Sequence, residues 1–326
     1  MRKILLIRLS SLGDIVLLTP VIEILSKKAE IHLITQEEYK ELFENDSRVK
    51  EIHSLKNGFR DSIETLKEIR KINFDMSVDL HLKPLSLIFL LFSKAKRKRF
   101  YRKRLMERRL SVLLKRKIKE IPISYLYYRP FSIFIKSVKN LPLPRIYPPE
   151  GNKLPLPEKF VALAPGAKYE TKRWPGFLEL AKLLKKEIKI PIVLVGDSRD
   201  LDIAKEIERE VEVMNLVGKT TLRELIFVLS KSSFLVSNDS GTGHLAAALG
   251  KPVYILFGPT IPEFGFRPHG FLVRIFEVEI PCRPCSLHGE KKCMRGDLAC
   301  LSEISHKEVY NAIREDLKNI FNLKFP

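Results

Sequence analysis

Short apolar runs alternate with longer stretches of helical spacing along the first 150 residues. A strand buried in a parallel sheet reads as a continuous apolar run, whereas a covering helix has apolar residues three and four positions apart. The pattern therefore predicts a parallel sheet covered by helices. The helix expected over residues 13–28 contains Pro20, which removes an internal hydrogen bond and predicts a kink or a break. The expected strands are residues 3–9, 31–35, 49–54 and 74–80.

The second half repeats this alternation, with helices expected over residues 177–189 and 201–210. Before it, six prolines lie between residues 141 and 159, a stretch that favours neither helix nor central strand and is the expected linker. The expected strands are residues 160–164, 190–196, 212–216, 234–237 and 253–257.

The chain therefore divides into an N-terminal domain, residues 1–150, and a C-terminal domain, residues 151–326. The predicted fold class is α/β, with two Rossmann-like doubly wound domains facing each other across a cleft. In such sheets ligands bind at the carboxyl ends of the strands, so function is sought in the turns that follow strands.

The composition supports two folded domains, because 326 residues with 45% hydrophobic and 30% charged residues exceed one small core and exclude a disordered chain. The formal net charge is +19, and residues 94–119 hold 14 basic residues and a single acid, Glu107. Such a field attracts phosphate on nucleic acid, on anionic lipid or on a substrate. The alternative is a charged surface typical of heat-adapted proteins.

The class of nucleic-acid-binding proteins is disfavoured, since no recognition motif accompanies the basic stretch. A dinucleotide dehydrogenase is disfavoured because no GxGxxG follows the first strand. No targeting segment is recognised, and the longest apolar run, residues 85–92, is far shorter than the roughly 20 residues that span a bilayer. A cytoplasmic location is expected.

Three turns that follow strands carry candidate chemistry. In residues 237–244, SNDSGTGH, Asp239 and Ser240 can cap a helix whose glycine-rich first turn leaves backbone N–H groups open to a pyrophosphate. His244 adds a hydrogen-bond donor. The alternative, a structural cap with a buried histidine, is equally compatible with the sequence.

The other two turns supply one charged side chain each. Lys172 follows the turn APGA at residues 164–167 and can neutralise a departing diphosphate, or it is surface charge beside a packed Trp174. Asp14, in the opening SSLGD, is either a helix cap or a carboxylate that accepts a proton from an attacking hydroxyl. On the residues alone, the cap is favoured.

Taken in order, SSLGD, APGA, KRWP, NDSGTGHLAAALG and FGPT resemble the heptosyltransferases of glycosyltransferase family 9. Each motif alone is weak, but the ordered set is specific and covers nearly the whole chain except about residues 94–149. The resemblance implies a GT-B fold with the acceptor on the N-terminal domain and an ADP-sugar on the C-terminal one. In such a fold the last helix can pack back on the N-terminal domain.

The resemblance also implies an activity. Members of the family transfer L-glycero-D-manno-heptose from ADP-heptose to the Kdo-containing inner core of lipopolysaccharide, with inversion and without a required metal or other cofactor. The implied partners are ADP-heptose, a Kdo-lipid A or heptosylated core acceptor, and the anionic inner face of the inner membrane, with no nucleic acid. Another GT-B sugar-nucleotide enzyme, with a different donor sugar or an epimerase activity, is the alternative.

Roles carry over by position from the resemblance. Asp14 becomes the base and Lys172 the diphosphate contact, while a ribose contact falls near Asp200 or Asp202. The implied donor-binding residues are Ala167, Lys168, Thr220, Asp239, Ser240, Gly241, Thr242, Gly243 and His244. The basic residues expected to hold the acceptor or the membrane are Lys83, Arg97, Lys98, Arg99, Arg102, Lys103 and Arg104.

Four cysteines, Cys282, Cys285, Cys293 and Cys300, lie within 19 residues. The first CxxC spacing suits a structural zinc site, but the following intervals are less typical of one. A disulfide or four free thiols are the alternatives. Relatives with a similar PCxPC segment indicate a structural loop rather than a catalytic one.

Overall fold

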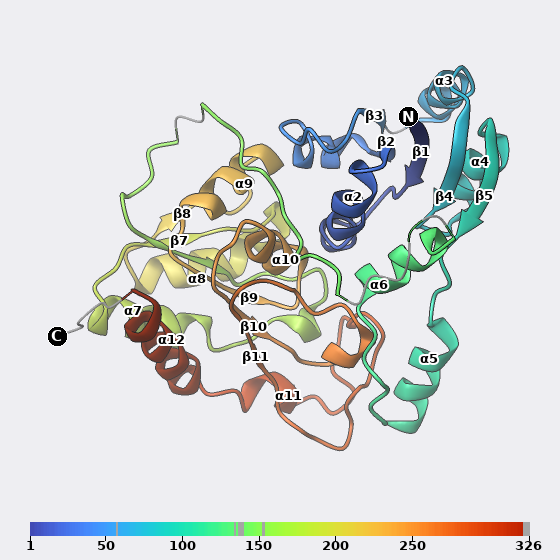
Figure 1. The fold of residues 1–326 in the computed structure, drawn as a ribbon. Coiled ribbons are helices and arrows are strands. Elements are labelled where there is room, and N and C mark those ends of the chain that lie inside the picture. The colour runs from blue at the N-terminus through green and yellow to red at the C-terminus, as the bar shows by residue number, and fades with distance from the viewer. Residues whose placement is uncertain (57, 134, 136–139, 152–153, 322–326) are drawn as a thin grey trace. The chain divides into compact units, whose positions relative to one another are not determined.

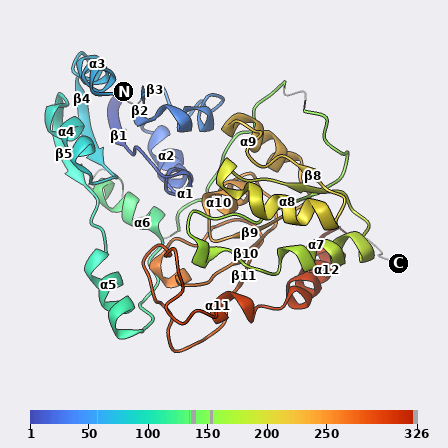
Figure 2. The same ribbon diagram turned by 180° about the vertical axis from the view of Figure 1, so that it is seen from behind.

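The computed structural model describes residues 1–56, 58–133, 135, 140–151 and 154–321, and Figures 1 and 2 show its ribbon from two sides. The chain forms two compact units. Unit 1 comprises Met1–Arg104 and Ile121–Glu150, and unit 2 comprises Leu105–Glu120 and Gly151–Pro326. The division at residue 150 thus has one excursion, because Leu105–Glu120 belongs to the second unit.

Unit 1 contains a five-stranded parallel sheet in the order β3-β2-β1-β4-β5. The four expected strands are confirmed, and a fifth, β5, was missed because its sequence AKRKRF has no apolar run. Charged side chains suit this edge position, since they discourage pairing with another chain. The strands are β1 (Arg2–Ile7), β2 (Ala29–Gln36), β3 (Glu51–Leu55), β4 (Phe74–Asp79) and β5 (Ala95–Phe100).

The predicted break at Pro20 is confirmed. Two helices replace the single expected one, and Pro20 lies in the first turn of the second, where its missing N–H is not needed. The helices of unit 1 are α1 (Leu12–Val16), α2 (Thr19–Ser26), α3 (Phe59–Ile69), α4 (Pro84–Phe92) and α6 (Ile123–Tyr128), with 3₁₀ turns at Glu37–Leu42 and Arg129–Phe131.

Unit 2 contains a six-stranded parallel sheet in the order β11-β10-β9-β6-β7-β8. The five expected strands are confirmed, and the partly exposed edge strand β11 was missed. The strands are β6 (Val161–Ala164), β7 (Ile192–Leu194), β8 (Met214–Asn215), β9 (Leu235–Asn238), β10 (Val253–Leu256) and β11 (Val273–Phe276).

Helices cover both faces of this sheet. Val161 and Leu163 of β6 join a core with α7, α8 and α12, whereas the intervening Ala162 is buried on the opposite face. On that face α10 packs on β9 and β10. Burial on both faces explains why these strands are continuous apolar runs. The helices are α5 (Leu105–Leu114), α7 (Phe177–Glu187), α8 (Leu201–Glu210), α9 (Leu222–Lys231), α10 (Gly241–Ala248), α11 (Ala299–Ser302) and α12 (His306–Phe321), with 3₁₀ turns at Glu170–Lys172, Ser198–Asp200 and Pro262–Phe264.

The last helix, α12, lies beside α7 in both views (Figures 1 and 2). Val309 and Ile313 of α12 are buried in the core of unit 2. The described part of α12 thus packs on unit 2, and packing of the last helix on the N-terminal domain stays a prediction. Among the helices of the described residues, none is long and apolar enough to cross a membrane.

Candidate functional site

The turn after β1 places Asp14 in the first turn of α1. The hydroxyl of Ser11, the residue preceding α1, donates a hydrogen bond to Asp14 Oδ2 at 2.9 Å, and its backbone N–H lies 3.4 Å from the same oxygen. Tyr127 of α6 donates its hydroxyl to the other oxygen, Oδ1, at 2.9 Å. The Asp14 side chain keeps 17% of its surface exposed, so it is held firmly but not sealed from solvent.

A buried arginine, Arg8, pairs with this carboxylate. An Arg8 terminal nitrogen lies 2.6 Å from Asp14 Oδ2, and the guanidinium also donates to the carbonyl of Leu80 and lies 5.4 Å from the Tyr127 ring centroid. Sequence reasoning missed Arg8 and Tyr127 as site residues. The signal for Arg8 was a charge directly after a strand of buried apolar residues, where an unpaired charge is costly.

These contacts set the ionisation of Asp14. Burial raises the pKa of the carboxyl, but the charge of Arg8 and the hydrogen bonds from Ser11 and Tyr127 outweigh it, so the pKa lies below its ordinary value. Asp14 is therefore ionised near neutral pH and is a weak base. The two interpretations of Asp14, a helix cap or a catalytic carboxylate, are compatible. Asp14 forms a capping box with Ser11, while its other oxygen accepts a hydrogen bond from Tyr127.

His81 is a second titratable group near Asp14 that sequence reasoning missed. Burial, followed by the charges of Arg8 and Lys103, lowers the pKa of His81 to about 4. The neutral ring can donate Nδ1–H to the carbonyl of Ser10, 3.1 Å away. Lys103 Nζ donates to the His81 carbonyl at 2.6 Å. Lys103, a member of the predicted basic patch, thus contacts this site.

In unit 2, the buried Asn238 at the end of β9 ties two turns together. Its Oδ1 accepts the backbone N–H of Trp174 at 3.0 Å, and its Nδ2 donates to the carbonyls of Pro165 and Gly166 at 2.8 and 3.1 Å. The sequence marked both turns but not this link. Because all of these groups are buried, the amide fixes the turn after β6 against the turn after β9.

The predicted diphosphate contact, Lys172, forms an ion pair with Asp239, and both side chains are nearly buried. Thr260 donates its hydroxyl to Asp239 Oδ2 at 2.9 Å. Ser240 directly precedes α10, and its hydroxyl lies 3.1 Å from that of Ser237. The first N–H groups of α10, from Gly241 onward, have no partner within the helix and form a cationic end close in sequence to this pair.

Close packing explains two glycines near these turns. A Cβ on Gly166 would lie 1.9 Å from the carboxyl carbon of Asp200, and one on Gly243 would lie 2.5 Å from Ile255 Cδ1. Asp200 is buried and pairs with Arg173 at 3.1 Å, whereas Asp202 is exposed on α8. Of the two aspartates considered from sequence, Asp200 therefore lies against the APGA turn.

The remaining predicted donor residues are distributed around these turns. Ala167 is buried, and its carbonyl accepts a hydrogen bond from Arg173. Lys168 is exposed, and its ammonium lies 5.5 Å from the Tyr169 ring centroid. Thr220 is half-buried beyond β8, and His244 is buried in α10.

The predicted basic stretch is divided between the two units. Arg97, Lys98 and Arg99 are exposed on β5, and Lys83 is exposed before α4. Arg102 is exposed and Arg104 is half-buried beyond β5. Leu105–Glu120 belongs to unit 2, where the Arg108 guanidinium lies 4.6 Å from the Phe266 ring centroid and Lys117 pairs with Glu279 at 2.5 Å. The stretch therefore is not a single surface of one domain.

All four cysteines are free thiols that line one cavity of about 580 Å³ in unit 2. No three of their sulfur atoms lie within 4.8 Å of one another, a criterion that His32, Glu51 and His53 meet among the described residues. A closed zinc site is therefore not formed by these thiols as they stand, and zinc there stays a prediction.

The loop that carries the four cysteines, residues 282–300, contacts the turns that hold Lys172 and Asp239. Thr171, next to Lys172, exchanges two hydrogen bonds with the backbone of Glu290 at 2.8 and 2.9 Å. The buried Arg283 donates to the carbonyls of Gly258 and Thr260 at 2.6 and 2.9 Å. Since Thr260 holds Asp239, the loop positions the ion pair, which agrees with a structural role.

Solved structures share this architecture. The glycosyl transferase family 9 protein from Veillonella parvula superposes with a TM-score of 0.79 at 19% identity, covering 98% of both chains. The E. coli ADP-heptose LPS heptosyltransferase II superposes with a TM-score of 0.74 at 23% identity, covering 96% of this chain and 99% of that one. The two doubly wound units with their strand-end turns thus define a protein of the GT-B fold, as expected.

The family follows from the sequence. The sequence model of the family described as glycosyltransferase family 9 (heptosyltransferase) matches residues 64–294 of this chain. The chain belongs to this family. Lipopolysaccharide heptosyltransferase 2 of Salmonella typhimurium is 33% identical over 151 residues, which are 40% of this chain and 43% of that protein. Matches to the first such relatives thus span less than half of their length. Lipooligosaccharide heptosyltransferase 2 of Campylobacter jejuni is 26% identical over 82% of both chains.

Proposed function

We propose that this protein is an inverting glycosyltransferase that moves L-glycero-D-manno-heptose from ADP-heptose to the Kdo-containing inner core of lipopolysaccharide. The observation that carries the proposal is the ionised Asp14 carboxylate, held by Arg8 and Tyr127 in the turn that leaves β1. Membership of family 9 and the names of the heptosyltransferase relatives support the substrate class.

The reaction is a single displacement. An acceptor hydroxyl attacks the anomeric carbon, a new C–O bond forms, and the bond to the diphosphate oxygen breaks with inversion. Asp14 takes the hydroxyl proton. Because its pKa is low, it accepts this proton late, when the attacking oxygen has already become acidic. Tyr127 and Ser11 hold the carboxylate in place, and the product leaves as the glycoside and ADP.

In this scheme unit 2 stabilises the leaving group. The first N–H groups of α10 and the Lys172 ammonium face developing negative charge on the diphosphate. Asp239 holds Lys172 before the donor arrives, so the ammonium is oriented rather than mobile. These groups supply the charge that a metal ion supplies in many sugar-nucleotide enzymes, and the scheme needs no bound cofactor.

We assign the membrane-facing surface to α4 and β5. Five apolar side chains of α4 are exposed: Leu85 at 37%, Leu87 at 37%, Ile88 at 43%, Leu91 at 64% and Phe92 at 54%. The neighbouring edge strand β5 presents a row of exposed cations. Apolar side chains beside cations match an anionic bilayer surface, where the lipid acceptor resides. The same cations match the phosphates and carboxylates of the acceptor.

Sedimentation with anionic vesicles tests this surface. Each cation near such a membrane contributes about 1 kcal/mol, so Lys98→Gln with Arg99→Gln weakens binding by roughly 30-fold. Lys186→Gln with Lys205→Gln, which removes equal charge from α7 and α8, is the matched control. Equal binding of both double variants contradicts the assignment.

The activity is tested by mass spectrometry with ADP-heptose and truncated Kdo-lipid A. A lengthened glycolipid with release of ADP supports the transferase, whereas a free altered donor indicates an epimerase. Asp14→Asn keeps the shape of the side chain but cannot take the proton, and loss of general-base catalysis costs about 10²- to 10⁴-fold in kcat. Retained turnover removes Asp14 from the mechanism.

A further inference from the structure

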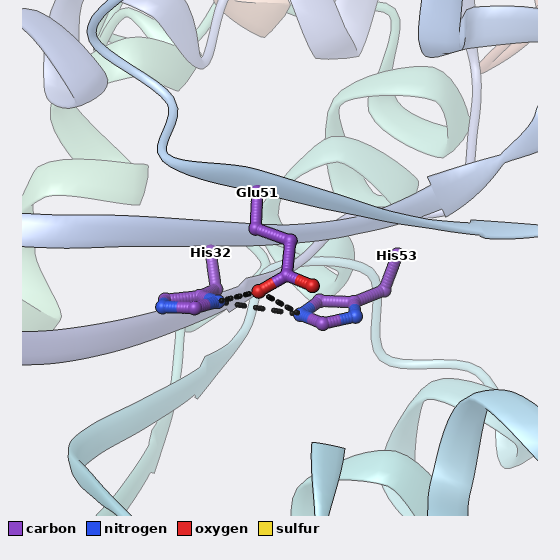
Figure 3. Close-up of side chains that lie close together, drawn as sticks. All are labelled: His32, Glu51 and His53. Atoms are coloured by element: carbon purple, nitrogen blue, oxygen red, sulfur yellow. Dashed lines mark hydrogen bonds and ion pairs between the residues drawn. The ribbon is translucent and has the colours of Figure 1, made fainter. Parts of the chain in front are cut away.

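A cluster of two histidines and a glutamate lies on one face of the unit 1 sheet, apart from Asp14. Strand register brings the three residues together, because His32 of β2 is the register partner of Glu51 of β3, and His53 follows two residues later. Residues two apart in a strand share a face. Figure 3 shows the two imidazole rings and the carboxylate pointing toward one another.

The donor atoms converge closely. His32 Nδ1 lies 3.3 Å from His53 Nε2 and 3.2 Å from a carboxylate oxygen of Glu51, which in turn lies 3.9 Å from His53 Nε2 (Figure 3). Both histidine side chains are nearly fully buried, at 4% and 2% exposure, whereas Glu51 is 52% exposed. The histidine side of the cluster is therefore buried, and the glutamate side is open to water.

Burial of the two rings favours their uncharged form. Burial, followed by the neighbouring His53, lowers the pKa of His32, and burial likewise lowers the pKa of His53. A neutral imidazole offers one nitrogen lone pair to a metal ion. The two ring nitrogens and the carboxylate oxygen that face one another are atoms of the kinds that bind transition metals.

An outer partner is also present. Glu68 of α3 lies 3.8 Å from His53 Nδ1, the ring nitrogen that faces away from His32. A carboxylate at the second nitrogen of a histidine orients the ring and strengthens its first nitrogen as a metal ligand. The Nε2 atom of His32 is buried without a hydrogen-bond partner, so no other group fixes the tautomer of this ring.

We propose that His32, Glu51 and His53 bind a divalent transition-metal ion, for which Zn²⁺ is the best match. His32 Nδ1, His53 Nε2 and a Glu51 oxygen are the three protein ligands, and water at the exposed side of Glu51 completes a tetrahedral set. The ion connects β2 to the edge strand β3 and fixes the pairing of these strands. This site is separate from the residues of the proposed transfer reaction and from the four cysteines.

The experiment must separate this site from the thiols, which also bind zinc. Zn²⁺ is added to the metal-free full chain, and the imidazole ¹⁵N resonances of its seven histidines are followed by NMR. The expected result is that His32 Nδ1 and His53 Nε2 shift as the ion binds. Affinity is then measured from these resonances in a chelator-buffered series of free Zn²⁺ concentrations.

Variants of exposed groups test the ligands without disturbing the core. Glu51→Gln is expected to weaken Zn²⁺ affinity by more than the roughly 10- to 100-fold that loss of an outer partner costs, and Glu68→Gln by about that amount. Glu30→Gln is the matched control, because it removes the same charge from β2 without removing a ligand. Its affinity is expected to equal that of the unaltered chain.

Two results overturn the proposal. One is zinc bound by the chain while both imidazole resonances stay in place, which assigns the ion to the thiols only. The other is equal affinity of the Glu51→Gln and Glu30→Gln variants, which shows that the carboxylate is no ligand. Neither readout depends on the transferase reaction.

Discussion

The Arg8–Asp14 ion pair gives a prediction that tests the unit 1 site directly. Replacing Arg8 by Gln removes the charge that counteracts burial at Asp14. Burial then dominates, and the pKa of Asp14 moves from below its ordinary value to above it. The carboxyl therefore becomes protonated at a higher pH in the variant than in the unaltered protein.

The size of the effect follows from the geometry. The ionic contact is 2.6 Å and both side chains are nearly buried. At an effective dielectric constant of about 20, unit charges about 4 Å apart attract by roughly 4 kcal/mol. Removing one partner of a buried pair costs about 3–5 kcal/mol of stability because the other charge remains buried.

The sign of the pH dependence is fixed by the same shift. In the unaltered protein Asp14 has a lowered folded pKa, so its contribution to stability is present above its unfolded pKa and lost as pH falls through the folded value. In Arg8→Gln the folded pKa is raised, so stability is lost as pH rises through it. The destabilisation by the variant must therefore grow between acidic and neutral pH.

Urea unfolding across this pH range measures the difference, and the acid limb of kcat/KM reports the same carboxyl in the free enzyme. The control places Arg8→Gln in an Asp14→Asn background, where the Asp14 carboxyl is absent and the pH dependence of the Arg8→Gln effect should vanish. If Arg8→Gln destabilises the protein equally at acidic and neutral pH, or leaves the acid limb in place, Arg8 does not govern Asp14.

Three further predictions concern unit 2. Lys172→Met keeps the packed stem of the side chain but loses its charge, so kcat is expected to fall by about 10²- to 10³-fold in the glycolipid assay. Lys186→Met, on an exposed face of α7, is the control and should leave kcat unchanged. Gly166→Ala should cost about 1–3 kcal/mol in urea unfolding because its Cβ meets the Asp200 carboxyl, and adding Asp200→Ala should restore part of that stability; no rescue refutes the clash. Asn238→Ala leaves the buried backbone groups that Asn238 binds without hydrogen-bond partners, which costs roughly 1–3 kcal/mol of stability for each group. A loss of unfolding free energy below about 1 kcal/mol would contradict the role of Asn238 in joining the turns.

Strand prediction succeeded where burial on both faces made the strand a continuous run of apolar residues. β1 and β10 contain apolar runs because both faces of their sheets are covered, so the local sequence records the environment. It failed at β5, where AKRKRF lies at an exposed edge, and at the partly exposed β11. An edge strand is defined by its pairing with a neighbour, and no run of apolar residues reports that pairing.

The candidate site was predicted in part for the same reason. The turns that hold Asp14, Lys172 and Asp239 follow buried strands, and the sequence could locate them because parallel strands carry ligand sites at their carboxyl ends. It could not show that Lys172 pairs with Asp239, nor that Tyr127 reaches Asp14 across 113 positions of the chain.

The amino-acid sequence by itself determined the α/β class, the positions of the buried strands along the chain and the turns that carry the chemistry, since each is encoded by neighbouring residues. The tertiary structure alone decided which charges meet. Arg8 meets Asp14 because burial leaves the guanidinium no water, and His32 meets Glu51 and His53 because the register of β2 and β3 aligns them. Such meetings depend on packing between distant segments, which local patterns do not specify.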